Sequence, residues 1–134
     1  MPAKVLDSFA LIAYFRGEVP GAAVRDLLDK AASADRPLDM SDVNYAEVKY
    51  MLIKKDGNAA WGQAAKVLEG LPIQFHSTSR SLADAAADFK ARFKISLADA
   101  FAAALTKEKK AELVTGDPEF KPLEKELTIN WLKA

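Results

Sequence analysis

The chain has 134 residues with 19 basic and 19 acidic side chains, no cysteine and a formal net charge of zero, and half of its residues are hydrophobic. These counts predict one folded domain, residues 1–134, and exclude charge-driven disorder, a disulfide framework, a thiolate nucleophile and a thiolate zinc site. The longest apolar run, residues 100–105, is too short for a membrane span and no convincing cleavage site follows the N-terminus, so we expect a soluble cytoplasmic protein.

Short strand-like segments alternate with helical patterns along the whole chain. In chain order we expect a strand at 5–6, helices at 9–15 and 22–32, a strand at 37–40, a helix from 41 or 42 to about 55, a helix at 59–68, a strand at 73–75, helices at 81–93 and 96–109, a strand at 112–115, one helical turn at 122–127 and a strand at 129–132. This alternation predicts an α/β fold, a central and mostly parallel sheet flanked by helices on both faces. In such sheets the ligand site lies at the carboxyl ends of the strands, near the point where strand order reverses.

Two acidic residues directly follow predicted strands. Asp7 comes after the first strand, where it is either the N-cap of the next helix or, if Ser8 provides the cap, free for another role. Asp117 follows the strand that ends at Thr115; an Asp-Pro pair is an ordinary turn starter, but Thr115 and Asp117 can face the same side of an extended chain. Both acids are therefore candidates for a site at the sheet edge.

Two further acids stand out on predicted helices. Glu47 falls within an apolar stripe made by Val43, Ala46, Tyr50 and Met51, where a carboxylate without a partner is costly; a lysine such as Lys54 is the alternative explanation. Asp99 lies in the first turn of a helix that is apolar nearly all round and so is expected to be buried, although the helix dipole alone could also stabilise an acid there.

Convergence of these four acids would require either bound cations or protonation of the cluster. At an effective dielectric constant near 20 and about 5 Å separation, each pair of carboxylates repels by roughly 3 kcal/mol, and six such pairs would rival the stability of a domain. Oxygen ligands without histidine or cysteine select Mg²⁺ or Mn²⁺, which activate water and stabilise phosphoryl oxygens. The single histidine, His76, is interpreted as structural, and no phosphate-binding glycine loop occurs. The residues thus indicate a metal-dependent nuclease or phosphatase.

Four segments resemble the PIN-domain family in order and spacing: Val5-Leu6-Asp7-Ser8, Asn44-Tyr45-Ala46-Glu47-Val48, Ser96-Leu97-Ala98-Asp99-Ala100 and Val114-Thr115-Gly116-Asp117-Pro118-Glu119-Phe120. The resemblance covers essentially the whole chain, which looks like a VapC-type toxin of a type II toxin–antitoxin pair. It implies a PIN-like domain with a parallel sheet of about five strands. It also implies that Asp7, Glu47, Asp99 and Asp117 are metal-binding catalytic acids, and that Ser8 and Thr115 support them from behind.

The function that the resemblance implies is Mg²⁺- or Mn²⁺-dependent hydrolysis of RNA phosphodiester bonds by metal-activated water. On this hypothesis Asp7 and Asp99 bind one ion directly, while Glu47 and Asp117 complete its shell through water or hold a second ion. The implied partners are an RNA substrate, a second copy of the chain in a homodimer, and an antitoxin that fills the acidic cleft, often with an arginine. No membrane partner is expected.

Other functions remain open from sequence alone. A metal-dependent phosphatase or nucleotidase would use similar acids, although Phe9 occupies the place of the second aspartate of the haloacid-dehalogenase signature. A second alternative is a catalytically silent PIN-like binding module, which would have no need of the acids. A third is a domain in which all four acids serve only as helix caps and turn residues. Setting the four acids aside leaves 15 acidic against 19 basic side chains, so the zero net charge is compatible with a negative, metal-loaded centre in a basic surround.

Overall fold

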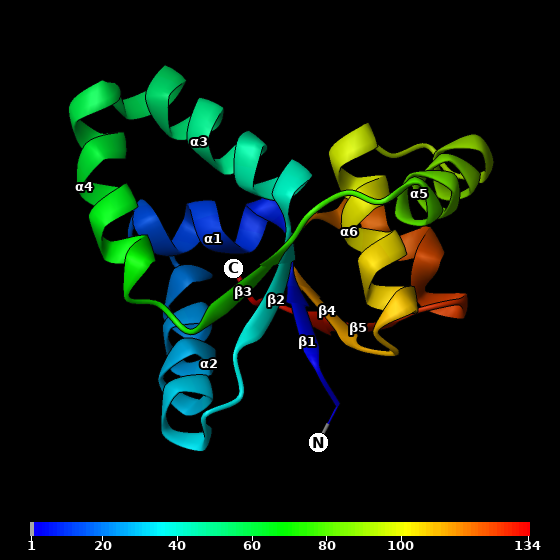
Figure 1. Ribbon diagram of the computed structural model, residues 1–134, viewed down its shortest axis with the longest axis horizontal. Coiled ribbons are helices and arrows are strands. Elements are labelled where there is room, and N and C mark those ends of the chain that lie inside the picture. Colours follow the sequence, from blue (N-terminus) through cyan, green and yellow to red (C-terminus); the bar gives the residue numbers. More distant parts are fainter. Residues whose placement is uncertain (1) are drawn as a thin grey trace.

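The computed structural model describes residues 2–134 as a five-stranded sheet between two layers of helices (Figure 1). The strand order is β3-β2-β1-β4-β5, and every neighbouring pair is parallel, so the sheet is all-parallel where the sequence predicts a mostly parallel one. The strands are β1 (Lys4–Leu6), β2 (Leu38–Ser41), β3 (Ile73–His76), β4 (Glu112–Thr115) and β5 (Thr128–Trp131). The α/β prediction is confirmed.

Helices cover both faces of this sheet. One layer holds α1 (Ser8–Phe15), α2 (Gly21–Ala34), α3 (Asp42–Asp56) and α4 (Asn58–Glu69). The other holds α5 (Arg80–Arg92), α6 (Leu97–Glu108) and the 3₁₀ helix η1 (Pro118–Lys125). Figure 1 shows α1 to α4 on one side of the strands and α5 and α6 on the other.

Neighbouring residues of the central strands belong to different halves of the core. Val5 and Leu113 pack under α5 and α6, whereas Leu6 and Val114 pack under α1 to α4, because successive side chains of a strand point to opposite faces. All four of these side chains are fully buried. This two-sided burial explains why β1 and β4 read as continuous apolar runs rather than as alternating patterns.

Three local predictions are wrong. The helix expected at 81–93 is α5, which begins at Arg80, and its N-cap is Ser79, whose hydroxyl accepts from the N–H of Leu82. The helical turn expected at 122–127 is the longer η1, which begins at Pro118, directly after Asp117. Leu97, expected on a helix buried on most sides, is 56% exposed, although the stretch from Asp99 to Thr106 is buried as predicted.

The topology fixes where a ligand site can form. From β1 the chain extends the sheet outward to β2 and β3, and it later returns to place β4 on the other side of β1. The carboxyl ends of β1 and β4 therefore flank the switch point, at which open α/β sheets bind ligands. Within residues 2–134, no helix is long and apolar enough to cross a membrane.

Candidate metal centre

Asp7 is held at the switch point by two hydrogen bonds, one to each carboxyl oxygen. Its Oδ1 accepts from the N–H of Ala10 at 2.9 Å, so Asp7, and not Ser8, is the N-cap of α1. Its Oδ2 accepts from the hydroxyl of Thr115, at the end of β4. The side chain is thus fixed between β1 and β4 and is only 1% exposed. Capping does not remove it from the site, because each carboxylate oxygen has a second lone pair.

The segment after β4 brings Asp117 to the same edge. The Asp117 N–H donates to the hydroxyl oxygen of Thr115 at 3.0 Å, so one threonine positions both acids. Gly116 lies between them against the ring of Phe9, and a Cβ at position 116 would overlap that ring. Glycine allows the chain to pass directly over the aromatic side chain, and an added Cβ would require the Phe9 ring to shift.

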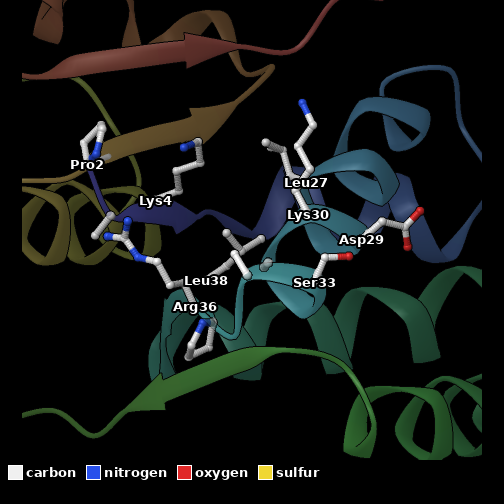
Figure 2. A pocket seen from close by; sticks show the side chains of 12 residues that line it. Pro2, Lys4, Leu27, Asp29, Lys30, Ser33, Arg36 and Leu38 are labelled. Atoms are coloured by element: carbon white, nitrogen blue, oxygen red, sulfur yellow. The ribbon is translucent and has the colours of Figure 1, made fainter.

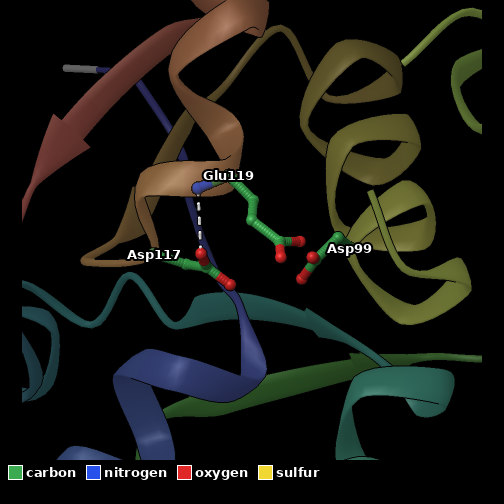
Figure 3. Close-up of side chains that lie close together, drawn as sticks. All are labelled: Asp99, Asp117 and Glu119. Atoms are coloured by element: carbon green, nitrogen blue, oxygen red, sulfur yellow. Dashed lines mark hydrogen bonds between the residues drawn. The ribbon is translucent and has the colours of Figure 1, made fainter. Parts of the chain in front are cut away.

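Asp99, Asp117 and Glu119 form the tightest acidic cluster in the described residues. One carboxylate oxygen of each lies within 4.8 Å of the others, and Figure 3 shows the three side chains converging from α6 and from the start of η1. Asp99 is buried, Asp117 half-buried and Glu119 exposed, so the cluster opens to solvent on one side. The Glu119 N–H also donates to Asp117 Oδ1 at 2.9 Å, which orients Asp117.

Glu47 reaches this edge for a different reason from the one predicted. The buried residues of α3 are Asn44, Val48 and Leu52, whereas Ala46 and Tyr50 of the expected stripe are exposed. Glu47 therefore lies beside the buried face, half-buried, and its charge acts on Asp99. The prediction of an apolar stripe around Glu47 is wrong.

Asn44 is a fully buried amide that joins three elements beneath the acids. Its Nδ2 donates to Ser8 Oγ at 3.0 Å and to the carbonyl oxygen of Ala98 at 3.1 Å, and its Oδ1 accepts from the hydroxyl of Ser41. These bonds fix the starts of α1, α3 and α6 relative to one another. The Ser8 hydroxyl is hydrogen-bonded to Asn44, and its link to the acids passes through this residue.

Burial and mutual repulsion make two of the acids reluctant to ionise. Burial, together with the smaller effect of the charges of Asp99 and Asp117, raises the pKa of Asp7 to about 8 against the opposing effect of its hydrogen bonds. Burial also raises the pKa of Asp99 to about 6, with the charges of Asp117 and Glu47 acting in the same direction. These mutual effects place Asp7, Asp99, Asp117 and Glu47 within one electrostatic neighbourhood.

The donor set fits a hard divalent cation. Every ligand atom offered by Asp99, Asp117 and Glu119 is a carboxylate oxygen, as Mg²⁺ and Mn²⁺ prefer, and neither histidine nor cysteine takes part. A cation among them would relieve the repulsion that raises the pKa of Asp7 and Asp99. An acidic cluster is therefore present at the predicted place.

Two residues of this site were missed by sequence reasoning. Glu119 follows Asp117 by two positions, and the Asp-Pro start of a 3₁₀ helix would have placed both carboxylates on one turn. Asn44 occupies the position three after the helix-capping Ser41, which is a recognisable local signal, but its bond to Ala98 joins segments 54 residues apart and has no local signature.

Two other features lie apart from the acids. His76, at the end of β3, is half-buried and is bonded through Nε2 to Oδ1 of the buried Asp39 at 2.7 Å, which is consistent with the structural role predicted for this histidine. A cavity of about 590 Å³ is lined by residues near the amino ends of β1 and β2 and by α2 (Figure 2). Since the acids lie at the carboxyl ends, this cavity belongs to the opposite edge of the sheet.

This arrangement defines the class as a parallel α/β domain with an acidic site at its switch point. Residues 4–126 match the PIN domain, and the chain belongs to the PIN-domain family. Comparison with curated proteins gives no significant match.

Solved structures with the same fold are VapC toxins of VapBC complexes. A chain of the DNA-bound VapBC complex from Salmonella typhimurium is 13% identical, with a TM-score of 0.76 over 99% of this chain and 100% of that one. A chain of VapBC2 from Rickettsia felis, bound to a promoter DNA fragment, is 14% identical, with a TM-score of 0.75 over 98% of this chain and 99% of that one. VapC20 of Mycobacterium tuberculosis, a toxin that cleaves the sarcin–ricin loop, is 18% identical, with a TM-score of 0.66 over 90% of this chain and 95% of that one. At these identities the likeness establishes the fold.

Proposed function

We propose that this chain is a divalent-metal-dependent endoribonuclease that acts as the toxin of a VapC-type toxin–antitoxin pair. The observation that carries the proposal is the oxygen-only acidic cluster at the switch point of a PIN domain. The similarity to VapC20, which cleaves a structured RNA loop, supports RNA as the substrate class. The chain has no cysteine, and its one histidine, His76, is hydrogen-bonded to Asp39 and is not part of the acidic cluster, so a cysteine or histidine nucleophile is not favoured.

The acids of the site would bind the metal ion, and the neighbouring polar residues would position the acids. Asp7, Glu47, Asp99 and Asp117, together with Glu119, would hold Mg²⁺ or Mn²⁺. When bound, such an ion lowers the pKa of a water molecule and offsets charge on the phosphate that this water attacks. Thr115 fixes Asp7 and Asp117, and Ser8 acts through Asn44.

The experiment is a cleavage assay on protein purified free of antitoxin, with a structured RNA and Mg²⁺ or Mn²⁺. We expect cleavage that EDTA abolishes and that Asp99→Asn reduces at least about 100-fold. The matched control is Asp84→Asn, an exposed aspartate on α5, which should cleave as the unmodified protein does. Cleavage that persists in EDTA contradicts the proposal.

Two parallel assays separate the other possibilities. Hydrolysis of a phosphomonoester without RNA cleavage would indicate a phosphatase or nucleotidase. Absence of Mn²⁺ binding in a calorimetric titration would indicate a catalytically silent module.

The proposed partners are an antitoxin and a second copy of the chain. Related folds have been crystallised in toxin–antitoxin complexes, such as the one from Klebsiella pneumoniae. We expect a co-expressed antitoxin to suppress RNA cleavage, and light scattering on the purified toxin to give the mass of a homodimer. A monomeric mass would remove the homodimer from the proposal.

A further inference from the structure

Large hydrophobic side chains are exposed at four positions in residues 2–134: Val19, Tyr50, Val67 and Leu97. Two of these four adjoin the acidic site. Tyr50 follows Glu47 by three residues on α3, and Leu97 precedes Asp99 by two residues on α6. A single exposed apolar side chain is common, but an exposed aromatic ring next to an acid of the site is also available for contact with a ligand.

Tyr50 is anchored at one end and open along its ring. Its hydroxyl donates to Glu47 Oε2 at 3.3 Å, while 48% of the residue is exposed. The hydrogen bond restrains the side chain beside the acid without covering the faces of the ring. Such a ring can contact a flat partner at little cost in conformational entropy.

Leu97 is the first residue of α6, the helix that carries Asp99. It is 56% exposed in the first turn of a helix whose following residues, from Asp99 onward, are buried. The bond from Asn44 Nδ2 to the Ala98 carbonyl oxygen fixes the start of α3 against the start of α6. Tyr50, bonded to Glu47, and Leu97 therefore lie on two different helices, and a buried amide fixes the position of these helices relative to each other.

The charge of the chain also favours apolar contacts with a nucleic acid. Its formal net charge is zero, so the general electrostatic attraction that dominates most nucleic-acid binding is modest here. Single-stranded RNA is commonly held by stacking of splayed bases on aromatic side chains, a contact that needs no net positive charge.

We propose that Tyr50 is a stacking platform for an unpaired RNA base next to the scissile phosphate, with Leu97 as the apolar contact on the α6 side. This inference rests on the proposed ribonuclease function and adds the residue that positions the substrate. It requires a substrate whose cleavage site is single-stranded or can be unstacked, such as a loop.

Steady-state cleavage of a short RNA by antitoxin-free protein with Mg²⁺ tests the proposal. Tyr50→Ala should raise KM about tenfold or more while kcat changes less than about twofold, and Tyr50→Phe, which keeps the ring, should recover most of the loss. Leu97→Ala should give a smaller rise in KM. Val67→Ala, an exposed apolar residue on α4, is the matched control and should leave KM unchanged.

Abasic substrates identify the contact itself. Replacing the stacked nucleotide by an abasic one should raise KM for the unmodified protein but have no further effect on Tyr50→Ala. Equal penalties in both proteins would overturn the proposal. An unchanged KM in Tyr50→Ala would also overturn the proposal, even if that variant bound the antitoxin less tightly. Equal losses in Tyr50→Phe and Tyr50→Ala would instead assign the effect to the hydroxyl on Glu47 and also overturn it.

A binding measurement separates this proposal from the ribonuclease assignment. Fluorescence anisotropy of the same RNA on Asp99→Asn reports binding without cleavage, and adding Tyr50→Ala should weaken it about tenfold. If the unmodified protein cleaves no RNA but this loss is seen, the function fails and the stacking site stands. If cleavage occurs but the loss is absent, the stacking site fails alone.

Discussion

Replacing Asp7 by asparagine tests whether the acidic centre destabilises the metal-free protein. Asp7 is 1% exposed and its pKa is raised by burial to about 8, far above the ordinary value of 3.8. In the native state without metal the group therefore keeps its proton at neutral pH, whereas in the unfolded chain it loses it. Asparagine has nearly the same shape, remains a good N-cap and carries no titrating proton.

The sign of the pH effect follows from this difference. Between the unfolded and native pKa values of Asp7 the native state binds one more proton, so the free energy of unfolding falls as pH rises. The slope is about 1.4 kcal/mol per pH unit, and the full window corresponds to on the order of 6 kcal/mol. Stability is highest below the unfolded pKa and the loss is complete above about pH 8.

The measurement is urea unfolding in EDTA at half-unit steps from pH 6.5 to 8. The pKa of Asp99 is raised to about 6, so this group is largely ionised throughout that range and contributes little to the slope. We expect the free energy of unfolding of the unmodified protein to fall by about 2 kcal/mol relative to Asp7→Asn. Groups that do not interact with Asp7 titrate equally in both proteins and cancel in the difference.

A matched variant and a metal titration complete the test. Asp84→Asn makes the same substitution at an exposed site on α5 and should follow the unmodified protein. Saturating Mn²⁺ should remove the slope from the unmodified protein, because binding to the native state holds the acids ionised. Parallel pH profiles for Asp7→Asn and the unmodified protein in EDTA would refute the reasoning.

Three further substitutions test how the site is built. Asn44→Ala should lower the free energy of unfolding, measured with urea, by about 3 kcal/mol, because it leaves buried partners without hydrogen bonds. Ser8→Ala should lower it by less. Equal losses would show that Asn44 is not the centre of this network. Gly116→Ala should destabilise by about 1–3 kcal/mol through overlap with the Phe9 ring, and adding Phe9→Leu should recover part of that loss; no recovery would place the strain elsewhere. Glu119→Gln should weaken Mn²⁺ binding at least about tenfold by calorimetry. Glu108→Gln, at the end of α6 and far from the cluster, is the control and should leave Mn²⁺ binding unchanged. Equal effects of the two changes would exclude a direct role for Glu119.

The sequence allowed the sheet edge to be predicted because the signal there is local. Apolar runs end at Asp7 and near Asp117, and parallel strands bring their carboxyl ends together, so the two acids could be assigned to one edge before any contact was known. The same reasoning works for Asp99, because the burial of α6 follows from its composition.

The helix α3 shows where this reasoning fails. Its interior face carries a polar residue, Asn44, in line with Val48 and Leu52, so an apolar-stripe search selects the neighbouring face and places Glu47 at its centre. Asn44 can be buried because its amide is hydrogen-bonded to Ser8 and Ala98, which are distant in sequence. Periodicity detects only apolar burial and cannot detect a polar group that is satisfied by remote partners.

The way in which the acids are held determines what can bind to them. Their recorded partners are neutral: Thr115 and Ala10 for Asp7, and Ser96 for Asp99. The ion pairs of Arg16 and Arg92 lie elsewhere on the surface and neutralise acids outside the site. Neutral donors fix the carboxylates in place without cancelling their charge. The site therefore keeps a net negative charge that is favourable for binding a cation from outside the chain. Under the proposed function a divalent metal ion supplies that positive charge in the active state, and an arginine of the antitoxin supplies it in the inhibited state.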